Sequence, residues 1–85
     1  MLDAARAEID DIDNQIVELL AKRLEICKKL GRYKKKNNVP IQNKEREKQI
    51  IKDRAKELKE LGFDDDKFVQ ELFGLIMKKA REVQK

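Results

Sequence analysis

The sequence contains no histidine and no tryptophan, and it has a single cysteine, Cys27. Without histidine, the chain lacks the side chain that most often transfers protons near neutral pH and most often binds metals. One cysteine cannot form an intrachain disulfide, and it cannot supply a cysteine cluster for a metal ion. We therefore predict no metal site, and we interpret Cys27 as a small residue of the core.

Long apolar runs are missing as well, so no segment is expected to cross a membrane. The first residues also lack the basic and then apolar regions of a signal peptide. These two absences favour a soluble, cytoplasmic protein. Charged residues make up 45% of the chain and the net charge is +4, with basic and acidic residues intermixed. Such a balance favours anionic partners only weakly, and it does not by itself indicate nucleic-acid binding.

Proline and glycine are scarce, with one proline and three glycines in 85 residues. The length fits a single domain, residues 1–85, and the few breaks leave room for long helices. Pro40 ends one predicted helix region and Gly62 ends the next, because proline and glycine disfavour helix continuation. The pattern predicts three helices, at about residues 3–36, 44–61 and 64–84. The expected fold class is therefore all-α, with three helices per chain.

The first predicted helix is unusually long. It begins near Asp3, a plausible N-cap, and its apolar residues recur with the spacing of three and four that is typical of an amphipathic helix. These residues are Ile9, Ile12, Ile16, Leu19, Leu20, Ile26, Cys27 and Leu30. A helix of this size is about 50 Å long, whereas a compact monomer of this length is about 30 Å across. A second chain is expected to cover the excess, so we predict a helical homodimer.

Charged and polar residues interrupt the inner face of all three helices. Arg23 and Lys34 fall on the apolar stripe of the first helix, Asn43, Arg46 and Glu47 extend the inner face of the second, and Gln84 extends that of the third. Arg6 lies near the start of the first helix. Such a surplus of cations suits a small polyanion, and guanidinium groups suit carboxylates. This group has no nucleophile–base pair, but it can catalyse by orientation and electrostatic stabilisation.

Simpler interpretations of the same residues exist. Arg23 and Glu47 could form a structural ion pair, Lys34 could extend along the surface, and Gln84 near the chain end could be exposed. Asn43 could act only as the cap of the second helix. Residues 33–36 (YKKK) could bind nucleic acid, although a single tyrosine offers a poor stacking platform.

The order and spacing of several motifs resemble the all-α chorismate mutases, a class of small intertwined helical dimers. The motifs cover nearly the whole chain: residues 9–16 (IDDIDNQI) after Arg6, 19–23 (LLAKR), 31–34 (GRYK), 39–47 (VPIQNKERE), and a third helix that ends at Gln84. The segment from Pro40 to Glu47 is the most specific, because it places arginine and glutamate at a fixed distance after proline. Two positions depart from the pattern: Asn43 stands where aspartate is common, and Ala80 where serine is common.

The resemblance implies an activity. Members of this family convert chorismate to prephenate, on the route to phenylalanine and tyrosine, by a pericyclic rearrangement that needs no cofactor. It implies that Arg23 and an Arg6 from the other subunit bind the two carboxylates of the substrate, with Arg46 supporting them. Lys34 and Gln84 would donate to the ether oxygen. Glu47 would accept from the ring hydroxyl, with Asn43 nearby.

Three alternatives stay open at this point. An isochorismate–pyruvate lyase has the same fold and a similar cationic pocket, although residues 40–47 look more like the mutases. A dimeric helical module that binds nucleic acid would require Arg23 and Gln84 to be exposed. Finally, the chain could work with a partner enzyme of the same pathway.

Overall fold

The computed structural model describes residues 1–85 and contains three helices and no strands. They are α1 (Leu2–Lys36), α2 (Lys44–Glu60) and α3 (Asp66–Gln84), which confirms the predicted all-α fold class. The helices begin and end within two residues of the predicted bounds. None of the three helices combines the length and the apolar character needed to cross a lipid bilayer.

The helix ends follow local sequence signals, with one exception. The side chain of Asn43 caps α2 by accepting a hydrogen bond from the backbone N–H of Arg46 (3.0 Å), and Asp65 caps α3 in the same way. Asp3 was predicted to cap α1, but this was wrong: Met1 holds the N-cap position without a side-chain bond, and Asp3 lies in the first turn. There its carboxylate still favours the positive end of the helix dipole.

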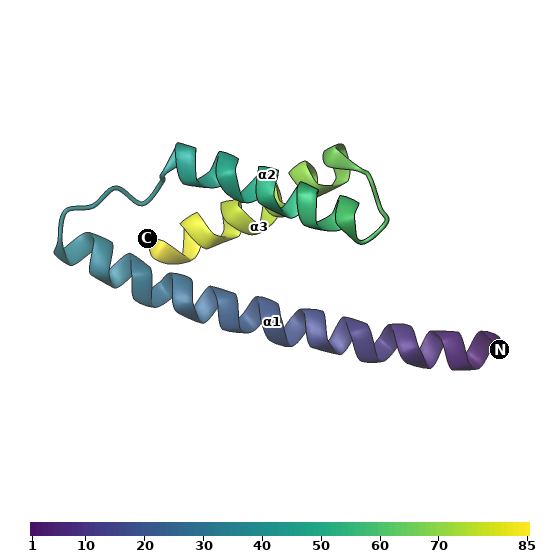
Figure 1. Cartoon of the computed structure of the whole chain (residues 1–85). Coiled ribbons are helices and arrows are strands. Elements are labelled where there is room, and N and C mark those ends of the chain that lie inside the picture. Colours follow the sequence, from purple (N-terminus) through teal and green to yellow (C-terminus); the bar gives the residue numbers. More distant parts are fainter.

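The turn between α2 and α3 depends on Gly62, whose φ of +102° is accessible mainly to glycine. The N–H of Gly62 donates to the carbonyl of Lys59, and the N–H of Phe63 donates to the carbonyl of Leu58, both at 3.0 Å. This pair of bonds is the Schellman motif that often ends a helix. The turn reverses the chain and brings α3 back along α2 (Figure 1).

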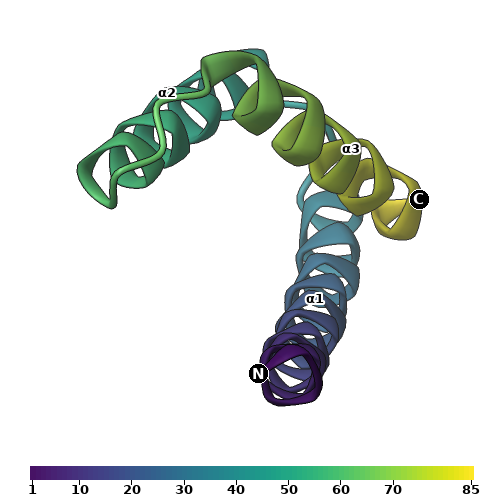
Figure 2. The same cartoon turned by 90° about the vertical axis from the view of Figure 1, so that its right-hand side faces the viewer.

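Helix α3 is the central element of the chain. Both α1 and α2 pack against α3 and not against each other, so the three helices form an open arrangement in which α1 and α2 diverge (Figure 2). Only six of the 85 residues are buried, and the apolar ones among them are Cys27, Val69, Met77 and Ala80. One chain alone therefore has a very small core, as is usual for a domain of this length.

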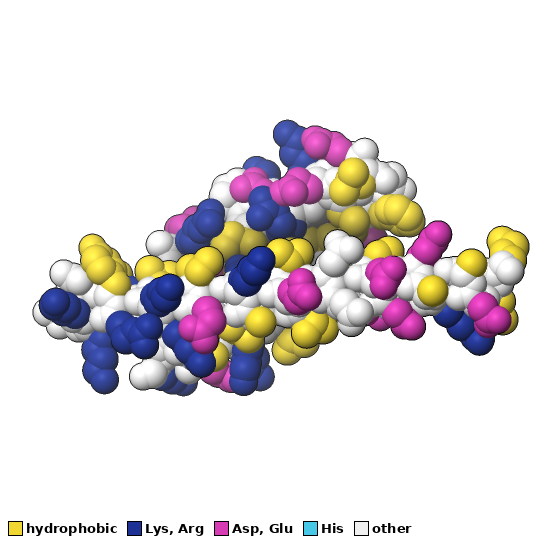
Figure 3. Space-filling view, turned by 90° about the horizontal axis from the view of Figure 1, so that it is seen from below, with side chains coloured by type: hydrophobic (Ala, Val, Ile, Leu, Met, Phe, Trp, Pro, Cys, Tyr) yellow, Lys and Arg dark blue, Asp and Glu magenta, His cyan; other side chains and the backbone are white.

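The N-terminal end of α1 extends beyond the other two helices (Figure 1). The long dimension of the chain is 54 Å, which matches the length of α1 rather than the width of a compact domain. The apolar stripe predicted to be buried is uncovered there, because Ile9, Ile12 and Ile16 are each about half exposed. Figure 3 shows apolar side chains along this stretch, with acidic side chains among them and most of the basic ones nearer the opposite end of α1.

Candidate active site

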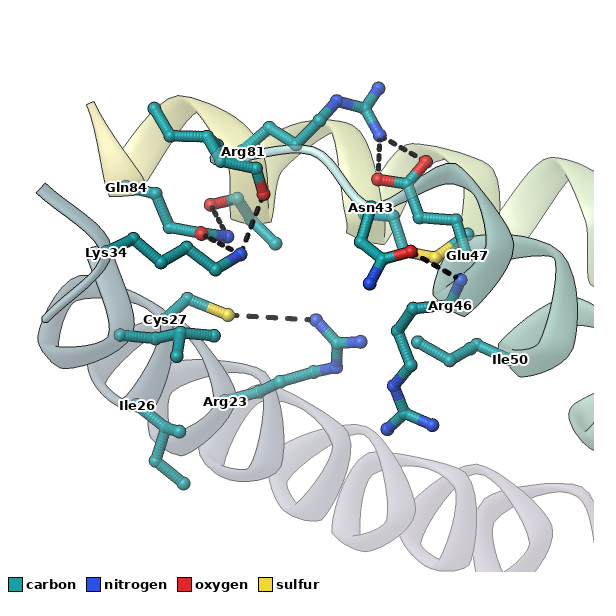
Figure 4. Close-up of a pocket in the computed structure, with 14 residues that line it drawn as sticks. Arg23, Ile26, Cys27, Lys34, Asn43, Arg46, Glu47, Ile50, Arg81 and Gln84 are labelled. Carbon is teal, nitrogen blue, oxygen red and sulfur yellow. Dashed lines mark hydrogen bonds and ion pairs between the residues drawn. The ribbon is translucent and has the colours of Figure 1, made fainter. Parts of the chain in front are cut away.

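A pocket opens where the C-terminal half of α1, the start of α2 and the C-terminal half of α3 meet (Figure 4). Its volume is about 270 Å³. The apolar part of its lining includes Ile26, Leu30, Ile41, Ile50 and Met77. The polar part is Arg23, Lys34, Asn43, Arg46, Glu47, Arg81 and Gln84. The structure thus brings together six of the seven residues predicted for the site and adds one more, Arg81.

Lys34 is fixed in place by two hydrogen bonds. Its ammonium group donates to the backbone carbonyl of Ile41 (2.7 Å) and to Oε1 of Gln84 (2.9 Å). The side chain therefore connects α1 to the loop before α2 and to the end of α3, and it does not extend along the surface. An ammonium group has three protons, so one remains for a ligand in the pocket.

Gln84 is buried, with 9% of its surface exposed, although it is the second-last residue described. Its Oε1 accepts from Lys34, and its Nε2 donates to the carbonyl of Ala80 (3.0 Å). These two bonds fix the orientation of the amide. Since Nε2 has two protons, the second is free to donate to a ligand. The alternative that Gln84 is an exposed residue of a frayed helix end is wrong.

Glu47 pairs with an arginine that sequence reasoning missed. Nη1 of Arg81 donates to both carboxylate oxygens of Glu47, at 2.7 and 2.8 Å. Arg23, which we considered as the partner of Glu47, donates instead to Sγ of Cys27 at 4.0 Å. A signal for Arg81 was present in the spacing, because it lies four residues after Met77 and three before Gln84, on the edge of the apolar face of α3.

Three cations of the pocket have no carboxylate partner. Arg23, Lys34 and Arg46 take part in no ion pair, and Glu47 is the only acidic residue in the lining. Asn43 uses its side-chain oxygen as the cap of α2, so its role there is structural. Charges that face one another without counterions repel, and an anionic ligand relieves this repulsion. The pocket is therefore suited to a small anionic molecule.

Arg6 does not belong to the pocket of its own chain. It is exposed near the free end of α1, about 25 Å along the helix axis from Arg23 at 1.5 Å per residue. One chain cannot bring the two together, because α1 is a continuous helix. Arg6 can therefore contribute to a pocket only if that pocket belongs to another subunit.

Gly31 allows the end of α3 to approach α1 closely. A Cβ atom at this position would lie 2.5 Å from the backbone oxygen of Gln84 and 2.6 Å from its Cα. Both distances are shorter than van der Waals contact, and the atoms concerned are backbone, which cannot rotate away. Gly31 is therefore the residue that lets Gln84 reach the pocket beside Lys34.

Replacing Gly31 with alanine is expected to move the C-terminal turn of α3 away from α1 and to break the bond between Lys34 and Gln84. Overpacking of this kind typically costs about 1–3 kcal/mol of stability. Thermal unfolding monitored by circular dichroism measures the loss. Gly74→Ala is the matched control, because a Cβ there meets no atom within 4 Å and alanine favours the helix. Equal melting temperatures for Gly31→Ala and the unchanged chain would contradict the close contact.

The chain resembles known proteins in sequence and in fold. The family model described as chorismate mutase type II matches residues 5–85. The chain belongs to this family. It is 35% identical over 81 residues to the chorismate mutase of Methanocaldococcus jannaschii, and this match covers 94% of the chain and 80% of that protein. The all-α family that the motifs at residues 9–16 and 39–47 resembled is therefore confirmed.

Other relatives are much longer than this chain. The T-protein of Enterobacter agglomerans is 34% identical over 79 residues, which cover 93% of the chain and 21% of that protein. The chain thus spans about a fifth of its length. Among solved structures, a conserved hypothetical protein from Pyrococcus furiosus matches with a TM-score of 0.79 and 39% identity, over 99% of this chain and 95% of that one. A solved structure therefore shares this fold over nearly the whole chain.

The nucleic-acid alternative does not agree with the structure. It required Arg23 and Gln84 to be exposed, whereas Gln84 is buried and Arg23 is partly buried. Both side chains line the pocket.

Proposed function

We propose that this domain converts chorismate to prephenate. The observation that carries the proposal is the composition of the pocket: three cations without counterions, one carboxylate, and the amide of Gln84 held beside one of these cations, Lys34. Chorismate carries two carboxylates, an ether oxygen and a hydroxyl. Each of these groups has a chemically matching partner in the lining.

Binding is proposed to orient the substrate. Arg23 and Arg46 have guanidinium groups available for carboxylates, which they can bind with two parallel hydrogen bonds. The apolar residues of the pocket contact the ring and hold it in a compact conformation. Restricting a flexible substrate to a conformation in which the reacting atoms are close accelerates a unimolecular rearrangement.

Lys34 and Gln84 are proposed to stabilise the transition state. In this rearrangement the bond to the ether oxygen breaks while a carbon–carbon bond forms, and negative charge develops on the oxygen. Each of the two side chains has one free proton on the same side of the pocket, and their other bonds are already made. Preorganised donors of this kind favour the transition state over the ground state. No proton has to be transferred.

The direct test is incubation of the purified chain with chorismate, with the absorbance of the conjugated diene followed over time. We expect loss of this absorbance and formation of prephenate, which acid converts to phenylpyruvate. An isochorismate–pyruvate lyase would instead release pyruvate from isochorismate. Absence of prephenate at high enzyme concentration would remove the proposed activity.

A second copy of the chain is proposed to complete the site. The uncovered apolar stripe of α1, with Ile9, Ile12 and Ile16 about half exposed, is the kind of surface that usually binds a partner. An intertwined dimer would cover this stripe and bring Arg6 of one subunit to the pocket of the other. Arg6 would then add a further guanidinium for the carboxylates, beside Arg23 and Arg46.

Relatives in longer proteins suggest a partner enzyme. A relative in Buchnera aphidicola (strain Sg), 38% identical over 80 residues, is described as a bifunctional chorismate mutase/prephenate dehydratase. An enzyme that consumes prephenate is therefore the partner that we propose for this domain, whether in the same chain or in a complex.

The proposal makes a prediction about pH. The amide of Gln84 does not titrate, whereas a carboxyl group in its place donates only when it is protonated. Gln84→Glu is therefore expected to be active at acidic pH and to lose activity as pH rises through the titration of the new carboxyl group. The unchanged chain should keep a nearly constant kcat above about pH 5.

The profile of kcat against pH measures this difference. The control is Gln70→Glu, which changes an exposed residue of the same helix and should leave the pH profile flat. A Gln84→Glu profile parallel to that of the unchanged chain would show that Gln84 donates no hydrogen bond in the transition state.

A relative with a different substrate defines the main competing proposal. The 4-amino-4-deoxychorismate mutase of Streptomyces pristinaespiralis is 32% identical over 76 residues, 89% of this chain and 58% of that protein. The substrate in its name differs from chorismate by an amino group in place of the ring hydroxyl. The choice between these two substrates depends on the environment of the one carboxylate in the pocket.

A further inference from the structure

The ion pair between Arg81 and Glu47 differs from all others in the structure. The other five ion pairs join residues three or four apart within one helix and are well exposed. This pair joins α3 to α2, and its side chains are only 29% and 21% exposed. Both oxygens of Glu47 accept from the same nitrogen of Arg81. Figure 4 shows the pair at the edge of the pocket, opposite the contact between Lys34 and Gln84.

The chemistry of the pocket decides which part of the substrate meets this pair. This step rests on the proposed function. Glu47 is the only carboxylate in the lining, so it would repel the two carboxylates of chorismate, which the free cations attract. The ring hydroxyl is the only hydrogen-bond donor of that substrate. The hydroxyl therefore faces Glu47.

We propose that Arg81 makes this domain selective for a substrate with an uncharged hydroxyl over one with an ammonium group at the same position. The carboxylate of Glu47 has about four acceptor positions, of which Arg81 occupies one on each oxygen and the amide of Gln42 one more on Oε1 (3.4 Å), so a hydroxyl can still donate to the free position on Oε2. Its negative charge, however, is already balanced. An ammonium group would lose its hydration on entering the pocket. In place of water it would contact the Arg81–Glu47 ion pair, which has no net charge, and the positively charged guanidinium of Arg81 would lie close to it.

Arg81 is a positioning and selectivity residue in this proposal, because it acts through Glu47. Without it, Glu47 would be an unbalanced carboxylate that attracts ammonium. The net charge of the rest of the lining would stay the same, so the effect should be confined to this end of the pocket. Repulsive elements that exclude the wrong ligand are a common source of selectivity.

The test compares kcat/KM for chorismate and for 4-amino-4-deoxychorismate, with the unchanged chain and with Arg81→Gln. We expect the unchanged chain to prefer chorismate, and Arg81→Gln to lower the ratio of the two values by about tenfold or more, the usual effect of one well-placed charge. Lys79→Gln is the matched control, because it removes one exposed positive charge from the same helix, where Lys79 pairs only with Glu82. Its ratio should not change.

Arg81→Lys separates selectivity from structural support. It keeps the charge but cannot reproduce the geometry of the guanidinium, so a purely structural role predicts equal losses on both substrates and an unchanged ratio in Arg81→Gln. The proposal predicts a ratio close to the original in Arg81→Lys, and this variant serves if Arg81→Gln folds poorly. An unchanged ratio in Arg81→Gln overturns the inference alone. An unchanged chain that prefers the amino substrate overturns the inference and favours the competing substrate. No turnover of either substrate overturns the proposed function with it.

Discussion

Lys34→Ala is expected to lower kcat by about 10²–10³-fold, the usual cost of removing one preorganised donor from a developing oxyanion. The ammonium group of Lys34 is held by Ile41 and Gln84 with one proton left over, so its replacement removes charge and donor together. It also leaves Oε1 of Gln84 without its partner, and the amide is then held only by its bond to Ala80.

Steady-state kinetics on chorismate measure this effect. Lys36→Ala is the matched control, because Lys36 lies on the last turn of the same helix, is exposed, and is not part of the pocket. We expect the control to keep kcat within about twofold. A Lys34→Ala variant with kcat close to that of the control would exclude Lys34 from stabilisation of the transition state.

Mixing two inactive variants is expected to restore activity. Arg6→Ala alone and Lys34→Ala alone should both be nearly inactive, each with a defect in every site. If Arg6 comes from the other subunit, a hybrid dimer of the two variants has one site with both residues intact and one with neither. Random exchange makes half of the dimers hybrids, so activity should return to about a quarter of the original value.

The experiment is performed by unfolding the two variants together, refolding them, and assaying the mixture against chorismate. The control mixes Lys34→Ala with Arg23→Ala, which come from the same chain in the proposed site, so every hybrid site has a defect. That mixture should stay inactive. Recovery in neither mixture would indicate that Arg6 does not serve the site of a partner subunit.

The elements of this fold could be predicted from the sequence because they depend on neighbouring residues. Helix periodicity, the Asn43 cap and the Gly62 turn each act over a few residues, and all three are present where the sequence indicated. Asp3 was an exception, since a favourable cap residue does not end a helix when the residue before it can also adopt helical geometry.

The composition of the site could also be anticipated, since polar residues on an apolar helix face are costly without a partner. Six of the seven predicted residues line one pocket, and the seventh, Arg6, lies at the far end of α1. Motif spacing located these residues because each lies at a fixed helical register. The spacing did not indicate which of them would form bonds with one another.

The sequence by itself thus determined the helices, the family, and the excess of cations over carboxylates on their inner faces. Only the tertiary structure decided the pairing. It placed Arg81 rather than Arg23 on Glu47, and it buried Gln84 against Gly31. The physical reason is that contacts between helices depend on how closely and at what rotation they pack against α3. A periodic pattern identifies the face of a helix, but not the residue that it meets.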